Sequence, residues 1–125
     1  MRTGQYAINF LITLTGILMA VVGHAGEVDV TDVSVDCNSG CDFNVTLRHD
    51  DEGWKHYANR WTVLTPDGKV LGTRVLYHPH VNEQPFTRSL SGVKIPDGIT
   101  EVIVRGHDLV HKEGGREMRV KLPSR

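Results

Sequence analysis

Residues 41–48 read Cys-Asp-Phe-Asn-Val-Thr-Leu-Arg, and within them Phe43, Val45 and Leu47 alternate with polar residues. Successive side chains of a β-strand point to opposite faces, so this alternation predicts a strand with one face against a core. Residues 26–125 show no comparable stretch with the 3.6-residue periodicity of a helix. The stretch therefore predicts an all-β domain.

The same alternation recurs on both sides of this stretch. Residues 27–35 place Val28 and Val30 on one face and then Val33 and Val35 on the other, and this change of phase predicts a β-bulge. Five further strands are expected on the C-terminal side, at residues 56–64, 71–77 and 86–93, around Val102 and Val104, and at residues 118–122.

Seven short strands in about a hundred residues predict an immunoglobulin-like or fibronectin-like Greek-key sandwich. A small closed barrel is the alternative. The disulfide that joins the two sheets of antibody domains is not expected, because Cys37 and Cys41 are too close in sequence. The resemblance to immunoglobulin domains is therefore one of architecture.

The N-terminus has the pattern of a signal peptide. Arg2 precedes an apolar run at residues 7–22, and Gly23-His24-Ala25 places small residues where signal peptidase requires them. We therefore expect residues 1–25 to be removed and residues 26–125 to form one periplasmic or secreted domain. An uncleaved membrane anchor is the alternative, whereas a lipid anchor is not expected, because no cysteine precedes residue 37.

The charge of residues 26–125 argues against some partners. Thirteen basic residues stand against fifteen acidic ones, and neither sign forms a block. This balance gives no basic field for nucleic acid or anionic lipid. We expect no nucleic-acid partner and, after cleavage, no membrane span.

The two cysteines enclose the turn sequence Asn-Ser-Gly. In an oxidising compartment a disulfide between Cys37 and Cys41 is the expected state, and it would stabilise a turn. A redox couple or a Cu(I)-binding dithiol is the alternative interpretation.

Histidines concentrate in three of the predicted connections. They fall between the second and third strands, between the fourth and fifth, and between the sixth and seventh, as His49 and His56, His78 and His80, and His107 and His111. In a Greek-key sandwich these connections emerge at one end, while the cysteine turn and the two Pro-Asp-Gly turns lie at the other. The sequence therefore predicts an end rich in imidazole.

Imidazole is a ligand for Zn(II) and Cu(II), so this end is a candidate metal site. Pro79 favours an extended His78, which would let His78 and His80 reach one ion together. Carboxylates in or beside the same loops could act as further ligands or orient the histidines, namely Asp50, Asp51, Glu52, Glu83, Asp108 and Glu113. Each histidine is also explained by ordinary hydrogen bonding in a loop, and Asp108 by capping of a turn.

The chain resembles the small periplasmic copper-resistance β-sandwich proteins of bacteria. The resemblance rests on the predicted export, the size, the seven predicted strands and the clustered histidines. The resemblance implies copper binding through histidines at one end, but it includes no aligned motif. Residues 26–125 contain one methionine, Met118, so a methionine-rich Cu(I) site is not expected. Cu(II) or Zn(II) is therefore the predicted ion.

Enzymatic motifs such as HExxH, GxSxG and the phosphate-binding loop are absent from the sequence. We favour a non-enzymatic role and leave Ser–His–Asp catalysis open, since nothing singles out a nucleophile. The leading hypothesis is an exported metal-binding protein. The alternative is an interaction module that docks a protein of the cell envelope through the same loops.

Overall fold

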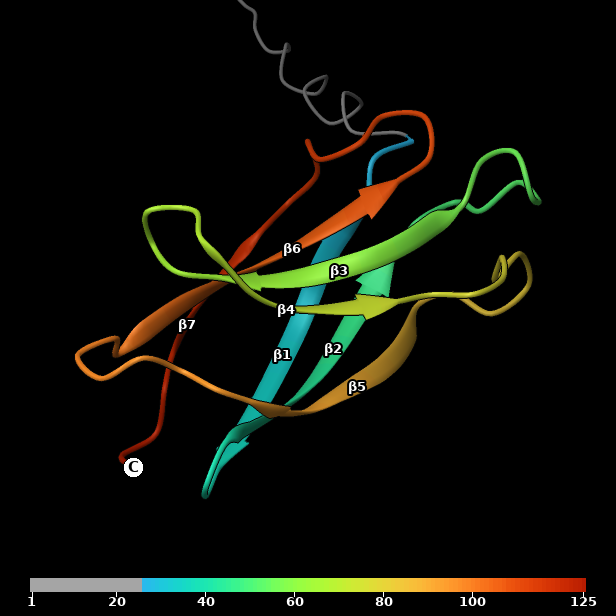
Figure 1. The fold of residues 1–125 in the computed structure, drawn as a ribbon. Coiled ribbons are helices and arrows are strands. Elements are labelled where there is room, and N and C mark those ends of the chain that lie inside the picture. The colour runs from blue at the N-terminus through green and yellow to red at the C-terminus, as the bar shows by residue number, and fades with distance from the viewer. Residues whose placement is uncertain (1–25) are drawn as a thin grey trace, which may run out of the picture.

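The computed structural model describes residues 26–125, which fold into two antiparallel sheets (Figure 1). The predicted signal peptide, residues 1–25, lies outside the described residues. One sheet has the order β1-β2-β5 and the other the order β4-β3-β6-β7. The strands are β1 (Asp29–Cys37), β2 (Cys41–Arg48), β3 (Ala58–Leu64), β4 (Val70–Val75), β5 (Phe86–Val93), β6 (Glu101–Asp108) and β7 (Met118–Lys121). The predicted seven-stranded sandwich is confirmed.

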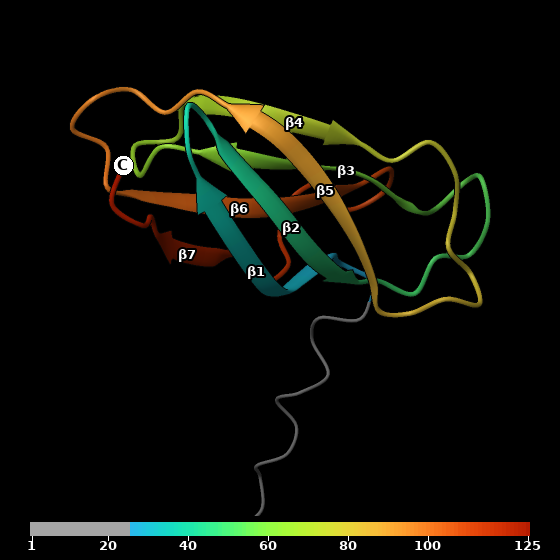
Figure 2. The same cartoon turned by 90° about the horizontal axis from the view of Figure 1, so that it is seen from below.

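The two sheets face each other across one hydrophobic core, and the strands of one run obliquely across those of the other (Figure 2). The predicted strand around Phe43 supplies three fully buried side chains, as Phe43, Val45 and Leu47 point inward from β2. Trp61 from β3 lies at the centre and is 0% exposed. Burying a side chain of this kind contributes about 1.5–3 kcal/mol, so this core holds the sheets together.

The predicted bulge in the first strand is confirmed. The pairing of β1 with β2 shifts register between Val30 and Asp32. Val30 is buried before the shift, and Val33 and Val35 pack against the core after it. The extra residue thus restores the inward direction of the valines that follow.

The expected strand limits differ from the observed ones by up to two residues, most visibly in the fourth strand. That strand ends at Val75, and Tyr77, which the sequence placed inside it, is 75% exposed. Leu76 turns inward instead and donates its backbone N–H to the carbonyl of Asn59.

Within residues 26–125, no helix is long and apolar enough to cross a membrane.

The cysteine turn carries the expected disulfide. Cys37 and Cys41 are bonded to each other and face each other across the β1–β2 hairpin. Both lie far from the histidine-rich loops, because the hairpin closes the opposite end of the sandwich (Figure 1). The disulfide therefore stabilises a turn that is separate from the candidate site.

Candidate metal centre

Three connections meet at one end of the sandwich, as the Greek-key order predicts (Figure 1). They are the β2–β3 loop, residues 49–57, the β4–β5 loop, residues 76–85, and the β6–β7 loop, residues 109–117. Long-range hydrogen bonds join the first two loops, because Gln84 accepts the backbone N–H of His49 and Asp51 accepts the backbone N–H of His80. The chain also enters the sandwich here, with Gly26 just before β1.

Asp108, the last residue of β6, lies at the centre of this end and is 0% exposed. Its Oδ1 accepts the backbone N–H groups of Val110 (2.8 Å) and His111 (2.5 Å), so Asp108 caps the turn as the sequence allowed. Its Oδ2 has no hydrogen-bond partner among residues 26–125. His49 Nε2 and His111 Nδ1 lie 3.3 and 3.4 Å from Oδ2, without hydrogen-bond geometry. Burying a carboxylate oxygen in this way costs free energy unless a positive group compensates.

Three imidazole rings surround this carboxylate. His49 Nε2 lies 3.3 Å from Oδ2, and His56 Nε2 lies 3.6 Å from Oδ1. The ring of His56 is 4.9 Å from that of His49 and 4.9 Å from that of His111, measured between centroids. One ligand atom from each of His49, His56 and Asp108 lies within 4.8 Å of the others, so this group could hold a metal ion.

A second layer of carboxylates orients two of these rings. Asp51 accepts a hydrogen bond from His49 Nδ1 (2.5 Å) and the backbone N–H groups of Ala58 (3.0 Å) and His80 (2.6 Å). Glu52 pairs with His56 Nδ1 at 2.7 Å, but its side chain is 70% exposed. Each ring therefore directs Nε2 toward Asp108, as in metal sites where a carboxylate holds the remote histidine nitrogen.

The pKa values of His49 and Asp51 move in opposite directions. Burial lowers the pKa of His49, but the hydrogen bonds to Asp51 and Gly26 and the nearby carboxylates outweigh it, and the pKa is raised. Burial raises the pKa of Asp51, but the hydrogen bonds from His49, His80 and Ala58 outweigh it, and the pKa is lowered. The pair therefore favours an imidazolium beside a carboxylate.

Gly26 is a member of the site that the sequence analysis did not identify. Its carbonyl oxygen lies 2.9 Å from His49 Nε2 and 3.3 Å from His56 Nε2. Both ring nitrogens of His49 thus face acceptors, which requires a doubly protonated ring. The one sequence signal for Gly26 is its position directly after the predicted cleavage site.

The other three histidines do not join the group around Asp108. His80 stacks on Phe86 with 4.0 Å between centroids, and its Nε2 accepts a hydrogen bond from Arg88 (2.9 Å). His78 is exposed, with its ring 4.8 Å from that of His80. The rings of His78 and His80 thus lie side by side, but Arg88 occupies Nε2 of His80, and shared binding of one ion by these two residues stays a prediction.

His107 neighbours Asp108 in the chain but points to the other face of its sheet. Its Nδ1 hydrogen-bonds Asn59 Oδ1 at 2.6 Å. Burial and the Arg60 cation lower the pKa of His107, and burial and Arg88 lower the pKa of His80. These two histidines therefore favour the neutral state in a cationic setting, unlike His49.

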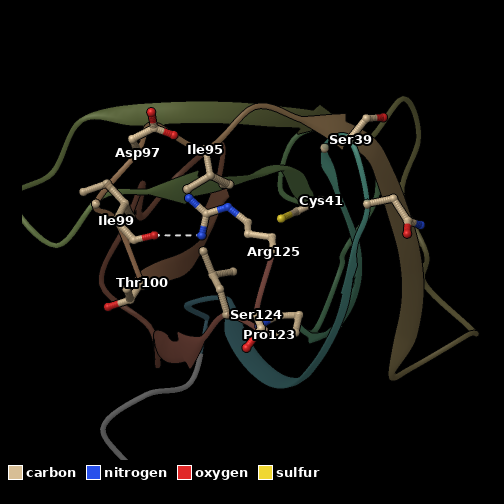
Figure 3. A pocket seen from close by; sticks show the side chains of 13 residues that line it. Ser39, Cys41, Ile95, Asp97, Ile99, Thr100, Pro123, Ser124 and Arg125 are labelled. Atoms are coloured by element: carbon tan, nitrogen blue, oxygen red, sulfur yellow. Dashed lines mark hydrogen bonds between the residues drawn. The ribbon is translucent and has the colours of Figure 1, made fainter.

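A hollow of about 540 Å³ lies at the opposite end of the sandwich, beside the cysteine turn (Figure 3). Its walls are formed by residues 38–41, 95, 97–100 and 122–125. The Arg125 guanidinium donates to the carbonyls of Ile99 (2.9 Å) and Pro96 (3.1 Å). None of the described residues that line this hollow is a histidine, so it lacks the imidazole groups of the other end.

The chain is similar in sequence to a curated protein. A protein of Halomicrobium mukohataei named "Putative lipoprotein" is 45% identical over 100 residues, which cover 78% of this chain and 49% of that protein. The chain thus spans about half the length of the curated relative it matches. No family model and no solved structure matches the chain, so the resemblance to copper-resistance proteins stays a prediction.

Proposed function

We propose that the chain is an exported protein that binds one Cu(II) or Zn(II) ion through His49, His56 and Asp108, with His111 beside them. The observation that carries the proposal is Asp108 Oδ2, a buried carboxylate oxygen that faces imidazole nitrogens and has no hydrogen bond within the part of the chain that the structure describes. A divalent cation among these groups would compensate the buried negative charge.

The donor set suits these two ions. Imidazole nitrogen and carboxylate oxygen are ligands for both Zn(II) and Cu(II), and Asp51 and Glu52 hold the remote nitrogens of His49 and His56. A metal ligand nitrogen must carry no proton. Binding at His49 Nε2 therefore replaces the proton that this nitrogen donates to Gly26, and metal binding should release protons.

Two observations support export of the chain. Residues 1–25 have the order of charge, apolar run and small residues of a signal peptide. The similar protein of Halomicrobium mukohataei bears the name of a lipoprotein, which fits a place outside the cytoplasm. We propose a periplasmic or secreted location for this chain.

Calorimetric titration of untagged protein with Cu(II) and Zn(II) tests the metal site. We expect one ion per chain. His56→Ala should lower the metal affinity more than about 100-fold, since loss of a residue that only hydrogen-bonds to a ligand already costs about 10–100-fold. His78→Ala is the matched control, because His78 is an exposed histidine of the same end that does not contact Asp108. Unchanged binding in His56→Ala, or equal losses in both variants, would refute the site.

A second candidate function has its own observation. Large apolar side chains are exposed on the same three loops, namely Trp54 (66%), Tyr77 (75%), Val81 (53%), Leu109 (37%) and Val110 (54%). Such a surface favours the alternative of a module that docks an envelope protein. Absence of stoichiometric metal binding in the titration would favour this alternative.

A further inference from the structure

The hollow beside the cysteine turn already holds a guanidinium group. Arg125 Nη1 donates to the carbonyl of Ile99 at 2.9 Å (Figure 3), and its Nη2 donates to the carbonyl of Pro96 at 3.1 Å. Two nitrogens of one planar head group thus reach two backbone carbonyls at once. The fork of an arginine side chain matches this pair of acceptors, whereas a lysine ammonium is a point charge without such a fork.

The turn Pro96-Asp97-Gly98 presents both carbonyls. Gly98 has a φ of 89°, which a residue with a side chain rarely adopts, so the shape of this turn depends on glycine. The backbone N–H of Ile99 donates to the carbonyl of Pro96 at 3.2 Å and closes the turn. A carbonyl oxygen has two lone pairs, so Pro96 can accept this bond and a guanidinium N–H together. The fold therefore fixes the two acceptors independently of Arg125.

The walls of the hollow suit the rest of an arginine side chain. Ile95 and Ile99 are half-buried and pack against the core, and they offer an apolar surface for a methylene stem. Among the described residues that line the hollow, Asp97 is the one charged residue besides Arg125. Without the Arg125 side chain these walls would carry a net negative charge, which favours a cation.

We propose that this hollow binds an arginine side chain of a partner protein, and that Arg125 occupies the same two carbonyls while no partner is bound. Arg125 is exposed, and water competes for its hydrogen bonds to neutral carbonyls, so the net free energy that holds it there is small. The incoming arginine displaces Arg125 and donates to Pro96 and Ile99 in its place.

Two observations favour an arginine within a peptide over a free small cation. Residues 123–125 all line the hollow, so the present occupant is itself part of a peptide segment. The hollow also retains about 540 Å³ with Arg125 in place, which leaves room for chain beside the side chain. This site lies at the opposite end of the sandwich from Asp108 and does not depend on the proposed metal centre (Figure 1).

Titration of the ¹⁵N-labelled exported protein with two peptides, followed by NMR, tests the proposal. One is acetyl-Pro-Ser-Arg-amide, which copies residues 123–125, and the other has lysine in place of arginine. We expect the arginine peptide to bind Arg125→Ala at least about tenfold more tightly than the unmodified protein, in which Arg125 competes, and to shift the amide signals of residues 97–100. The lysine peptide should bind Arg125→Ala at least about tenfold more weakly, the scale of one hydrogen bond to a charged group.

Arg119→Ala is the matched control, because Arg119 pairs with Glu101 and is not among the described residues that line the hollow. It should bind the arginine peptide as the unmodified protein does. Arg125→Lys is a second variant that keeps the stem and the charge, and it should also bind the arginine peptide more tightly than the unmodified protein. Equal affinities of the two peptides for Arg125→Ala, no shifts at residues 97–100, or equal binding by Arg125→Ala and Arg119→Ala would overturn the proposal.

Discussion

The six histidines at one end of the sandwich form two groups with opposite surroundings. His49, His56 and His111 lie around the buried Asp108, with Asp51 and Glu52 behind two of them. His78, His80 and His107 lie apart from that carboxylate, and two of them are close to the cations Arg88 and Arg60. Histidines at the same end of the sandwich therefore face opposite charges, and we propose that only the group around Asp108 binds metal.

The largest effect should follow from removing the charge that unites the first group. Asp108→Asn keeps an oxygen for the N–H groups of Val110 and His111 but takes away the buried negative charge. We expect metal affinity to fall more than about 100-fold, beyond what an outer partner contributes. Calorimetry with Cu(II) and Zn(II) measures this.

Asp97→Asn is the matched control, since Asp97 is an exposed carboxylate at the opposite end of the sandwich. The metal affinity of Asp97→Asn should equal that of the unmodified protein. Equal metal affinities of Asp108→Asn and Asp97→Asn would show that the buried carboxylate is not a ligand. The charge of Asp108 would then not distinguish the two histidine groups.

A smaller effect should follow from changing the second layer. Asp51→Asn removes the charge that holds His49 Nδ1, and we expect about a 10–100-fold loss of metal affinity. Glu52→Gln should cost less, because the Glu52–His56 pair is solvent-exposed and therefore weak. Equal losses from the two substitutions would show that burial of the orienting carboxylate does not matter.

His49 and His80 should also respond oppositely to pH in the metal-free protein. The pKa of His80 is lowered by burial and Arg88, so its contribution to stability is present above about pH 6.5 and is lost on acidification. The pKa of His49 is raised, so its contribution is present below about pH 6.5 and is lost as the pH rises through the folded value. Urea unfolding between pH 5 and 8 measures both effects.

Arg88→Gln sharpens this prediction. Without the guanidinium beside His80 Nε2, the pKa of His80 should rise toward its ordinary value, and the loss of stability below about pH 6.5 should become smaller. The part of the pH profile that belongs to His49 should stay as it was. If Arg88→Gln loses as much stability below about pH 6.5 as the unmodified protein does, Arg88 does not lower the pKa of His80.

The smallest effect on metal binding is expected from the far end. Replacing Cys37 and Cys41 by serine should lower the free energy of unfolding by about 2 kcal/mol or less, because the disulfide closes a short loop. Metal affinity should be unchanged, since neither sulfur is near Asp108. Loss of metal from the double variant would instead support the Cu(I) dithiol interpretation of the cysteines.

Much of the fold could be predicted because it depends on local alternation. Phe43, Val45 and Leu47 alternate with polar residues, and this pattern alone places β2 between a core and solvent. The phase change after Val30 likewise predicts the bulge. The end of β4 was missed because the apolar residues Leu76 and Tyr77 continue the sequence of the strand. Leu76 still donates its backbone N–H to Asn59 of β3, but the strand ends at Val75 and the Tyr77 side chain is exposed.

The candidate site could be predicted only as a region. The Greek-key order brings the right loops together, but which rings meet depends on contacts distant in sequence, such as the bond from the His80 backbone to Asp51. Spacing predicted that His78 and His80 would act together, whereas stacking on Phe86 turns His80 toward Arg88. The role of Gly26 follows from tertiary structure alone.

Anomalous scattering at the copper edge, from crystals of the mature protein grown with one equivalent of Cu(II), tests the central claim most directly. The account predicts one peak per chain, within about 2.0–2.2 Å of a nitrogen of His49, a nitrogen of His56 and an oxygen of Asp108. Copper at His78 or His80, or no bound copper at all, would contradict it.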